Sequence, residues 1–313
     1  MSNIANDRHH NKRSPTINAR DEIEMQLIWS DWIPLYGAGR NKSLPTTAGL
    51  YRIRSRGEKT LEYIGQTGET VGLRRRLGQL SGVFGDLMPY NDPHTAAPGL
   101  WALLQEQSIE LQISVCSLEE IDAQQRRGLE CLAIFQHRES FGCSPTLNFG
   151  RMPSGYFKSS QNNAALAKAG KRFRGGKVDE VLPCHSKSSI IYSQIKEVWS
   201  KARPIGWSPW MPIDKARLLA KSTTGIYIIK SETDPSAVYI GEGRVPARII
   251  AHLKKAKILD HRQSQFFSQK TKLSFSILET STLSKNQMLE QENDFIAHHL
   301  VQFGTTPTAQ FLG

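Results

Sequence analysis

Short β-type stretches followed by helical spacing give the first half of the chain a clear order of elements. Positions 49–54 and 61–65 are two short β-type runs, and a polar stretch connects them. The two runs and their connection together predict a β-hairpin. The apolar spacing then predicts a helix at 73–80, a strand at 110–116 and a long helix at 118–137. This order is typical of a small α+β domain built on an antiparallel sheet.

The same order of elements returns in the second half. Strands are predicted at 225–230 and 237–241, followed by a helix at 245–257. A further strand at 273–278 and a long helix at 285–301 complete the set. The pattern therefore predicts two tandem small α+β domains, each a short antiparallel sheet flanked by helices.

Five motifs also occur in both halves in the same order, which chance does not account for. The spacing of the motif tyrosines is equal, because 63 − 51 and 239 − 227 both give 12. The pairs are Trp29–Pro34 with Trp207–Pro212, Thr47–Tyr51 with Thr223–Tyr227, Tyr63–Gly65 with Tyr239–Gly241, Glu130 with Glu292, and Phe141–Phe149 with Phe303–Phe311. We infer an internal duplication.

The motifs set the expected boundaries of the two copies, residues 27–152 and 206–313. Residues 1–26 are expected to form a disordered tail, and residues 153–205 a basic linker with a helix at 188–202. Residues 156–177 contain no acidic side chain. This stretch is either a flexible strap along phosphates or a solvated linker, and the composition favours neither. Its basic residues include Lys171, Arg172, Arg174 and Lys177.

Charge and cysteine content narrow the classes of partner. The 313 residues contain 40 Lys and Arg against 29 Asp and Glu, a net charge of +11, which favours a polyanion such as nucleic acid. The four cysteines form no zinc-binding spacing, so we expect reduced thiols and no zinc. No apolar run is long enough to cross a bilayer, and the first residues lack a secretion signal. We therefore expect a cytoplasmic protein without a membrane partner.

The repeated residues resemble the GIY-YIG nuclease family in both halves. Its two tripeptides correspond to residues 49–51 and 63–65 in the first half, and to 225–227 and 239–241 in the second. Five such elements in order, twice, are a specific pattern. The functional positions that the resemblance implies are Tyr51, Tyr63, Arg76, Glu130 and Asn148 in the first half, and Tyr227, Tyr239, Arg248, His252, Glu292 and Gln310 in the second, where Gln310 replaces the family's asparagine.

Two assignments in the first half stay open. Arg74 and Arg75 precede Arg76, so either could be the family's arginine or contact nucleic acid instead. The second half has His252 four positions after its arginine, where the first half has Leu80. His94 lies in the first-half insertion at 82–99; it either replaces that histidine or belongs to a loop. By position, the insertion and the basic linker are candidate readers of DNA.

The resemblance implies a chemistry that suits these residue types. Glu130 and Glu292 would each bind Mg²⁺ or Mn²⁺, hard cations that prefer oxygen ligands and also bind phosphate. An arginine stabilises charge on the phosphoryl oxygens. The first tyrosine would accept the proton of the attacking water, the second would orient the phosphate or the water, and the closing amide would steady the glutamate or the substrate.

The sequence thus predicts a restriction-type or defence-type endonuclease that cuts duplex DNA with two sites in a single-chain pseudo-dimer, with higher oligomers left open. A ribonuclease or single-strand-specific nuclease is the first alternative, because groove and stacking contacts are not visible in a sequence. A non-catalytic nucleic-acid-binding module that kept the fold is the second.

Overall fold

Two four-stranded antiparallel sheets, one in each half, carry the fold. The computed structural model describes residues 27–89, 96–159, 169, 175–177, 187–191, 206–258, 260–268 and 272–311. The first sheet has the strand order β1-β4-β2-β3 and the second has the order β7-β10-β8-β9. The strands of the first sheet are β1 (Ile33–Pro34), β2 (Gly49–Ser55), β3 (Tyr63–Thr67) and β4 (Leu111–Ser117). The strands of the second sheet are β7 (Met211–Pro212), β8 (Thr224–Ser231), β9 (Ala237–Arg244) and β10 (Leu273–Glu279).

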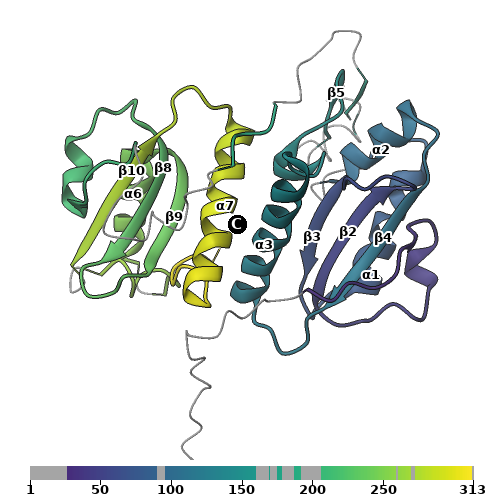
Figure 1. Cartoon of the computed structure of the whole chain (residues 1–313), viewed down its shortest axis with the longest axis horizontal. Coiled ribbons are helices and arrows are strands. Elements are labelled where there is room, and N and C mark those ends of the chain that lie inside the picture. The colour runs from purple at the N-terminus through teal and green to yellow at the C-terminus, as the bar shows by residue number, and fades with distance from the viewer. Residues whose placement is uncertain are drawn as a thin grey trace, which may run out of the picture.

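Helices cover both faces of each sheet. In the first half, α1 (Leu73–Gln79) and α2 (Ala97–Glu106) lie on one face and α3 (Ala123–Phe141) on the other; in the second, α6 (Val245–Lys255) and α7 (Lys285–Phe303) do the same. Figure 1 shows α3 and α7 side by side between the two sheets. The predicted α+β class, with antiparallel hairpins at β2–β3 and β8–β9, is confirmed. Short 3₁₀ turns η1 (Ala38–Arg40), η2 (Leu80–Phe84), η3 (Asn148–Gly150) and η4 (Ile213–Leu218), and the strand pair β5 (Tyr156–Phe157) and β6 (Gly176–Lys177), complete the described elements.

Alternation along β2 explains the two cores of the first half. Tyr51 and Ile53 point to the side covered by α1 and α2, whereas Leu50 belongs to the cluster under α3. Successive strand residues face opposite sides of a sheet, so a strand with helices on both faces is buried along its whole length. The second half repeats this division: Tyr227 and Ile229 pack with α6, and Ile226 and Ile228 pack with α7.

Several predicted boundaries and elements were wrong. The helix predicted from residue 118 begins at Ala123, because the Asp122 carboxylate caps it by accepting from the backbone N–H groups of Gln124 and Gln125. Residues 188–191 are not helical, although a helix was predicted there; the rest of that prediction, like the tail at 1–26, lies outside the described residues. The sequence reading missed α2 and the two-residue strands β1 and β7, which are too short to show alternation.

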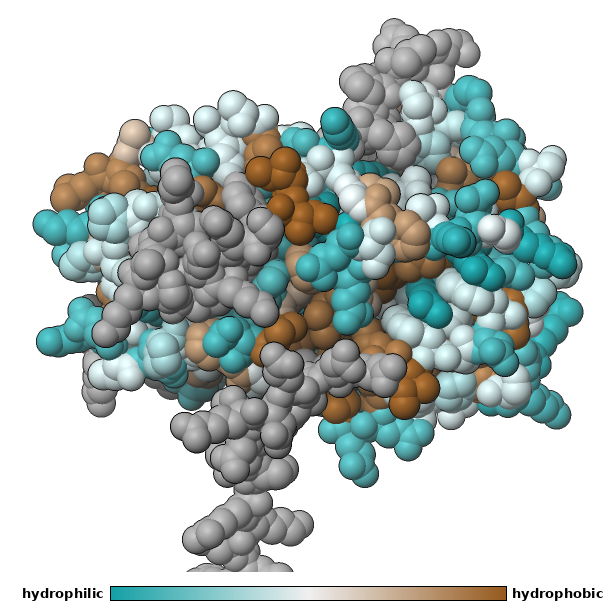
Figure 2. Space-filling model, viewed as in Figure 1, coloured by the Kyte–Doolittle hydropathy of each residue, from teal (hydrophilic) through white to brown (hydrophobic). Residues whose placement is uncertain are grey.

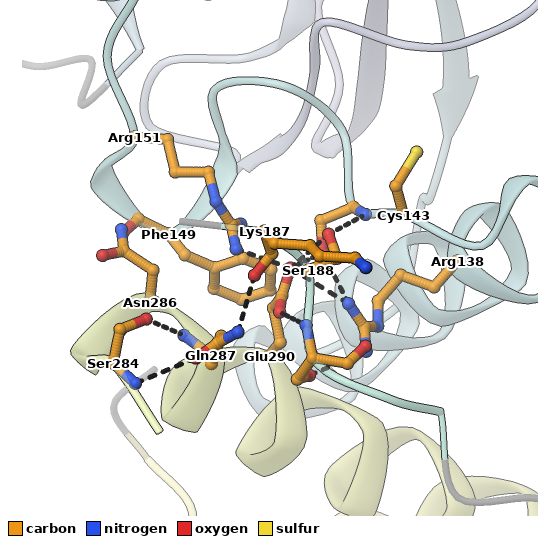
Figure 3. A network of polar contacts seen from close by, with 12 residues as sticks. Arg138, Cys143, Phe149, Arg151, Lys187, Ser188, Ser284, Asn286, Gln287 and Glu290 are labelled. Atoms are coloured by element: carbon orange, nitrogen blue, oxygen red, sulfur yellow. Dashed lines mark hydrogen bonds and ion pairs between the residues drawn. The ribbon is translucent and has the colours of Figure 1, made fainter. Parts of the chain in front are cut away.

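A buried ionic network joins α3 to α7 at one end of the helix pair (Figure 3). The Arg138 guanidinium contacts Glu290 at 3.0 Å, and its Nε donates to both carboxylate oxygens of Asp294 at 3.0 and 3.1 Å. Arg151 also contacts Glu290, at 2.7 Å, and the Ser189 backbone N–H donates to it at 2.6 Å. The charges are paired, as burial requires, although the Arg151 Nη1 is buried without a hydrogen-bond partner among the described residues.

The opposite end of the same helix pair is apolar. Equivalent positions on the two helices differ by 162, as for Glu130 and Glu292, so Leu300 corresponds to Arg138 and Gly128 to Glu290. A Cβ added at Gly128 would meet the side chains of Thr306 and Leu300, so these two ends pack closely. The two helices therefore meet through corresponding positions that carry charged residues at one end and small or apolar residues at the other.

Apolar and charged residues are unevenly distributed on the surface. On the face in Figure 2, apolar residues gather over the middle of the molecule, between the two halves, and hydrophilic residues surround them. Among the described residues, no helix combines the length and the apolar character needed to span a membrane.

Candidate active site

The first tyrosine pair lies beside a glycine that has no room for a side chain. Tyr51 on β2 and Tyr63 on β3 have ring centroids 6.1 Å apart, and their hydroxyl groups hydrogen-bond. Tyr51 is paired with Gly65 across the two strands. A Cβ at Gly65 would lie 2.6 Å from the Tyr51 Oη and 2.6 Å from the Tyr63 ring. The glycine therefore allows both phenols to lie over the hairpin.

The second half repeats this arrangement. Tyr227 and Tyr239 have ring centroids 6.0 Å apart, and Tyr227 is paired with Gly241. A Cβ at Gly241 would lie 2.5 Å from the Tyr227 Oη. Burial, followed by the neighbouring tyrosine, raises the pKa of both Tyr51 and Tyr227 well above the usual value. Both phenols are therefore protonated at neutral pH.

An arginine and a glutamate act on each tyrosine pair. In the first half, the charge of Arg76 lowers and that of Glu130 raises the pKa of Tyr51. In the second half, Arg248 and Glu292 have the same opposed effects on Tyr227. The tyrosines come from the hairpin, the arginines from α1 and α6, and the glutamates from α3 and α7. The fold therefore brings together, in each half, the four side chains that the motifs predicted.

The three successive arginines of α1 have different surroundings. Arg74 donates from Nε to the Leu44 carbonyl at 2.8 Å and from Nη2 to the Lys42 carbonyl at 2.6 Å, so it holds the preceding loop against the helix. Arg75 is exposed. Arg76 is the one whose charge acts on Tyr51. The geometry favours Arg76 as the site arginine over its two neighbours.

Both glutamates are held at raised pKa. Burial raises the pKa of Glu130 to about 7, against the opposing charges of Arg127 and Arg126. Burial, and then the charge of Glu242, raises that of Glu292 to about 8. Removal from water destabilises an anion, and a cation beside it reverses that effect. A carboxylate in this state gains more from a bound cation than a fully hydrated one does.

His252 contacts both tyrosines of the second half. Its Nε2 lies 3.0 Å from the Tyr227 hydroxyl, and its ring lies 4.2 Å from the Tyr239 ring between centroids. Burial, and then the charge of Lys255, lowers the pKa of His252 to about 4. The imidazole is therefore neutral near pH 7 and shares a hydrogen bond with the tyrosine hydroxyl. Leu80, buried at the end of α1, stands at this position in the first half.

The side-chain amides of Asn148 and Gln310 hydrogen-bond to the backbone of the edge strands β3 and β9. Asn148 accepts the Ile64 N–H at 2.9 Å and donates to the Ile64 carbonyl at 2.8 Å, which uses both ends of its amide. Gln310 accepts the Ile240 N–H at 3.2 Å. Both residues fix the strand that carries the second tyrosine.

Besides Arg74 and Arg75, the structure describes one other residue that was expected to contact nucleic acid. Lys177, on β6, has an exposed side chain whose Nζ contacts Glu106 at 2.7 Å, so its charge is paired. The other four, His94, Lys171, Arg172 and Arg174, lie outside the described residues.

Two features of the sites were not predicted from the sequence. His137 and His299 occupy equivalent positions, and each Nε2 accepts a backbone N–H at the start of the second strand, Leu61 at 3.0 Å and Ala237 at 2.9 Å. The spacing of 162 that relates the two helices could have identified them. The second feature is Glu242, a buried carboxylate one residue after the second tripeptide, which the motif comparison passed over.

A hexacoordinate cation such as Mg²⁺ fits these sites only with additional ligands. Within the described ranges, no group of three or more His, Cys, Asp or Glu side chains is placed to hold a metal ion. Mg²⁺ commonly binds through one or two carboxylates and completes its shell with water and phosphate oxygens. One partly buried glutamate beside an arginine and two tyrosines is compatible with that mode. The described cysteines Cys116, Cys131 and Cys143 are free thiols.

Comparison of the chain with models of protein families, with curated proteins and with solved structures found no significant match.

Proposed function

We propose that the protein is a metal-dependent endonuclease of the GIY-YIG type, in which two tandem copies each hydrolyse one strand of duplex DNA. One observation carries this proposal: the same set of two tyrosines, one arginine and one glutamate is assembled in each half from a hairpin and two helices. Packing alone does not explain it, because each glutamate is partly buried with a raised pKa, which costs free energy that a bound cation would offset.

Each side chain has a task in this reaction. Glu130 and Glu292 would hold the divalent cation, which supplies charge neutralisation at the phosphoryl oxygens. Arg76 and Arg248 would bind the same phosphate and stabilise the charge that builds up on it. In the second half, Tyr227 would accept a proton from the attacking water once the bound cation and Arg248 favour its phenolate form, and His252, whose Nε2 lies 3.0 Å from its hydroxyl, would orient it.

The helix pair supports two neighbouring sites. Burial first, and then the charges of Glu130 and Glu292, raise the pKa of the Cys131 thiol. Cys131 lies at the contact between α3 and α7, where its carbonyl accepts from the Asn293 side chain at 3.1 Å. The charges of both glutamates therefore reach the same thiol at the interface, which supports two neighbouring sites on a single duplex. The net charge of +11 favours that polyanionic partner.

The test is digestion of supercoiled plasmid with Mg²⁺, comparing the unchanged chain with Glu130→Ala, Glu292→Ala and the double variant. We expect linear product from the unchanged chain, nicked circles from each single variant and no cleavage from the double. Glu232→Ala, which removes an exposed carboxylate in the second half, is the matched control. Loss of both cuts from one single substitution would contradict independent sites.

The same assay separates the alternative functions. Cleavage of labelled RNA or single-stranded DNA, with duplex DNA untouched, would replace the duplex proposal with the first alternative. Binding of nucleic acid without cleavage of any of the three substrates would favour the non-catalytic module.

A further inference from the structure

The two candidate sites differ in their carboxylates. Gln66 and Glu242 each follow the second tyrosine by three positions and occupy equivalent places in their hairpins, opposite Leu50 and Ile226. The first half therefore has an amide where the second half has a carboxylate. Both residues lie on the sheet face covered by the helix that carries the glutamate.

In the first half, a buried arginine occupies the space beside this amide. Arg126 on α3 donates from Nε to the Gln66 Oε1 at 2.9 Å and from Nη1 to the Ile121 carbonyl at 3.1 Å. It lies one turn before Glu130, and its charge and that of Arg127 both oppose the rise in the pKa of Glu130. Arg126 also pairs with Glu69, whose exposed side chain lies 3.3 Å from its Nη1. Glu130 is therefore the only partly buried carboxylate described beside these two guanidinium groups, and a cation entering this site meets positive charge.

In the second half, the arginine is absent and the carboxylate is left partly unsatisfied. Met288 stands at the position equivalent to Arg126. Glu242 is 3% exposed; its Oε1 contacts the Lys285 Nζ and lies 3.4 Å from the Arg248 Nη2. Its Oε2 is buried and has no hydrogen-bond partner among the described residues. A buried carboxylate oxygen without a donor is destabilising, and a bound cation would satisfy it.

Glu242 is also placed to act together with Glu292. Lys285, its partner, lies two turns before Glu292 and on the same side of α7. The charge of Glu242 acts on Glu292, on both tyrosines and on Arg248, so it belongs to the same cluster as these four groups. Two carboxylates in one cluster attract a divalent cation more strongly than one carboxylate among arginines.

We propose that Glu242 is a second carboxylate ligand, and that the second half consequently binds a divalent cation more tightly than the first half, where Glu130 acts alone. The inference rests on the proposed function, because it concerns the same two sites. It adds an order of events: at limiting cation the second half is loaded first, so nicked circles precede linear DNA.

The test is Mn²⁺ binding to the full chain without DNA, followed by the loss of the free-ion electron paramagnetic resonance signal. We expect two classes of site, with the tight class weakened by at least about tenfold in Glu242→Gln, because the carboxylate count sets the affinity of oxygen sites. The matched control, Glu232→Gln, removes an exposed carboxylate from the same half and should leave both classes unchanged. Circular dichroism would verify that each variant is folded.

A second variant distinguishes a ligand from a structural ion-pair partner. Lys285→Ala removes the cation that competes for Glu242 and should tighten the tight class, whereas a purely structural Glu242 predicts no change or a weaker site. Two equal classes, or a tight class that survives Glu242→Gln, would overturn the inference while leaving a cleaving enzyme in place. Absence of any Mn²⁺ binding together with an intact plasmid would overturn the proposed function as well.

Discussion

The ionic network between the helices allows a quantitative prediction about Arg138. Its side chain is fully buried, and its Nε provides both hydrogen bonds to the Asp294 carboxylate. Arg138→Leu would leave that carboxylate buried without a cation, whereas Glu290 would still contact Arg151 at 2.7 Å. Stranding one member of a buried pair costs about 3–5 kcal/mol. We expect a loss of stability of that size from this one substitution.

The opposite end of the helix pair indicates how to recover the loss. The positions equivalent to Arg138 and Asp294 are Leu300 and Leu132, which belong to one apolar cluster. Arg138→Leu combined with Asp294→Leu would give the polar end the residues that already pack at the apolar end. Replacing a buried ion pair by apolar residues of similar volume is commonly neutral or stabilising. The double variant should therefore regain most of the stability that the single variant loses.

A double-mutant cycle measures this coupling. Urea unfolding of the four proteins, followed by circular dichroism and by tryptophan fluorescence, gives the free energy of unfolding and shows whether the two halves unfold together. We expect a coupling energy of about 2 kcal/mol or more between the two positions. A single variant that loses less than about 1 kcal/mol, or a double variant whose losses simply add, would refute the reasoning.

Three further predictions follow from the site and its surroundings. Gly65→Ala should abolish cutting by the first half alone and turn linear product into nicked circles, because its Cβ would displace Tyr51. Gly85→Ala, whose Cβ would make only an ordinary contact 3.5 Å from the Gly82 carbonyl oxygen, is the control in the plasmid assay. Burial lowers the pKa of His299 to about 4, so the unfolded chain takes up a proton before the folded chain does as the pH falls below 6.5. The free energy of unfolding should therefore drop by roughly 3 kcal/mol between pH 6.5 and 4. The urea midpoint of His299→Gln should fall less over this pH range, and the same fall in both proteins would refute the assignment. DNA affinity should fall steeply with added salt as bound counterions are released, measured by fluorescence anisotropy with a duplex, and a flat salt dependence would count against a basic binding surface.

Much of the fold followed from local patterns. Alternation located the β2–β3 and β8–β9 hairpins and helical spacing located α6 and α7, because periodicity is a property of a short stretch of chain. The long helix of the first half began late because a single cap, Asp122, decides where the helix starts. The edge strands β1 and β7 escaped detection because two residues show no period, and only their pairing with β4 and β10 makes them strands.

The sequence by itself determined which residues are repeated and in which order, since a motif and its spacing need no structure to be seen. The tertiary structure decided what each one touches. It separated Arg76 from Arg74, whose guanidinium holds a loop, and placed Asn148 on the backbone of Ile64. It also joined Gln66 to Arg126, 60 positions further along the chain, and left one Glu242 oxygen without a partner within the part of the chain that the structure describes. Such contacts depend on how distant segments pack, and no local pattern specifies them.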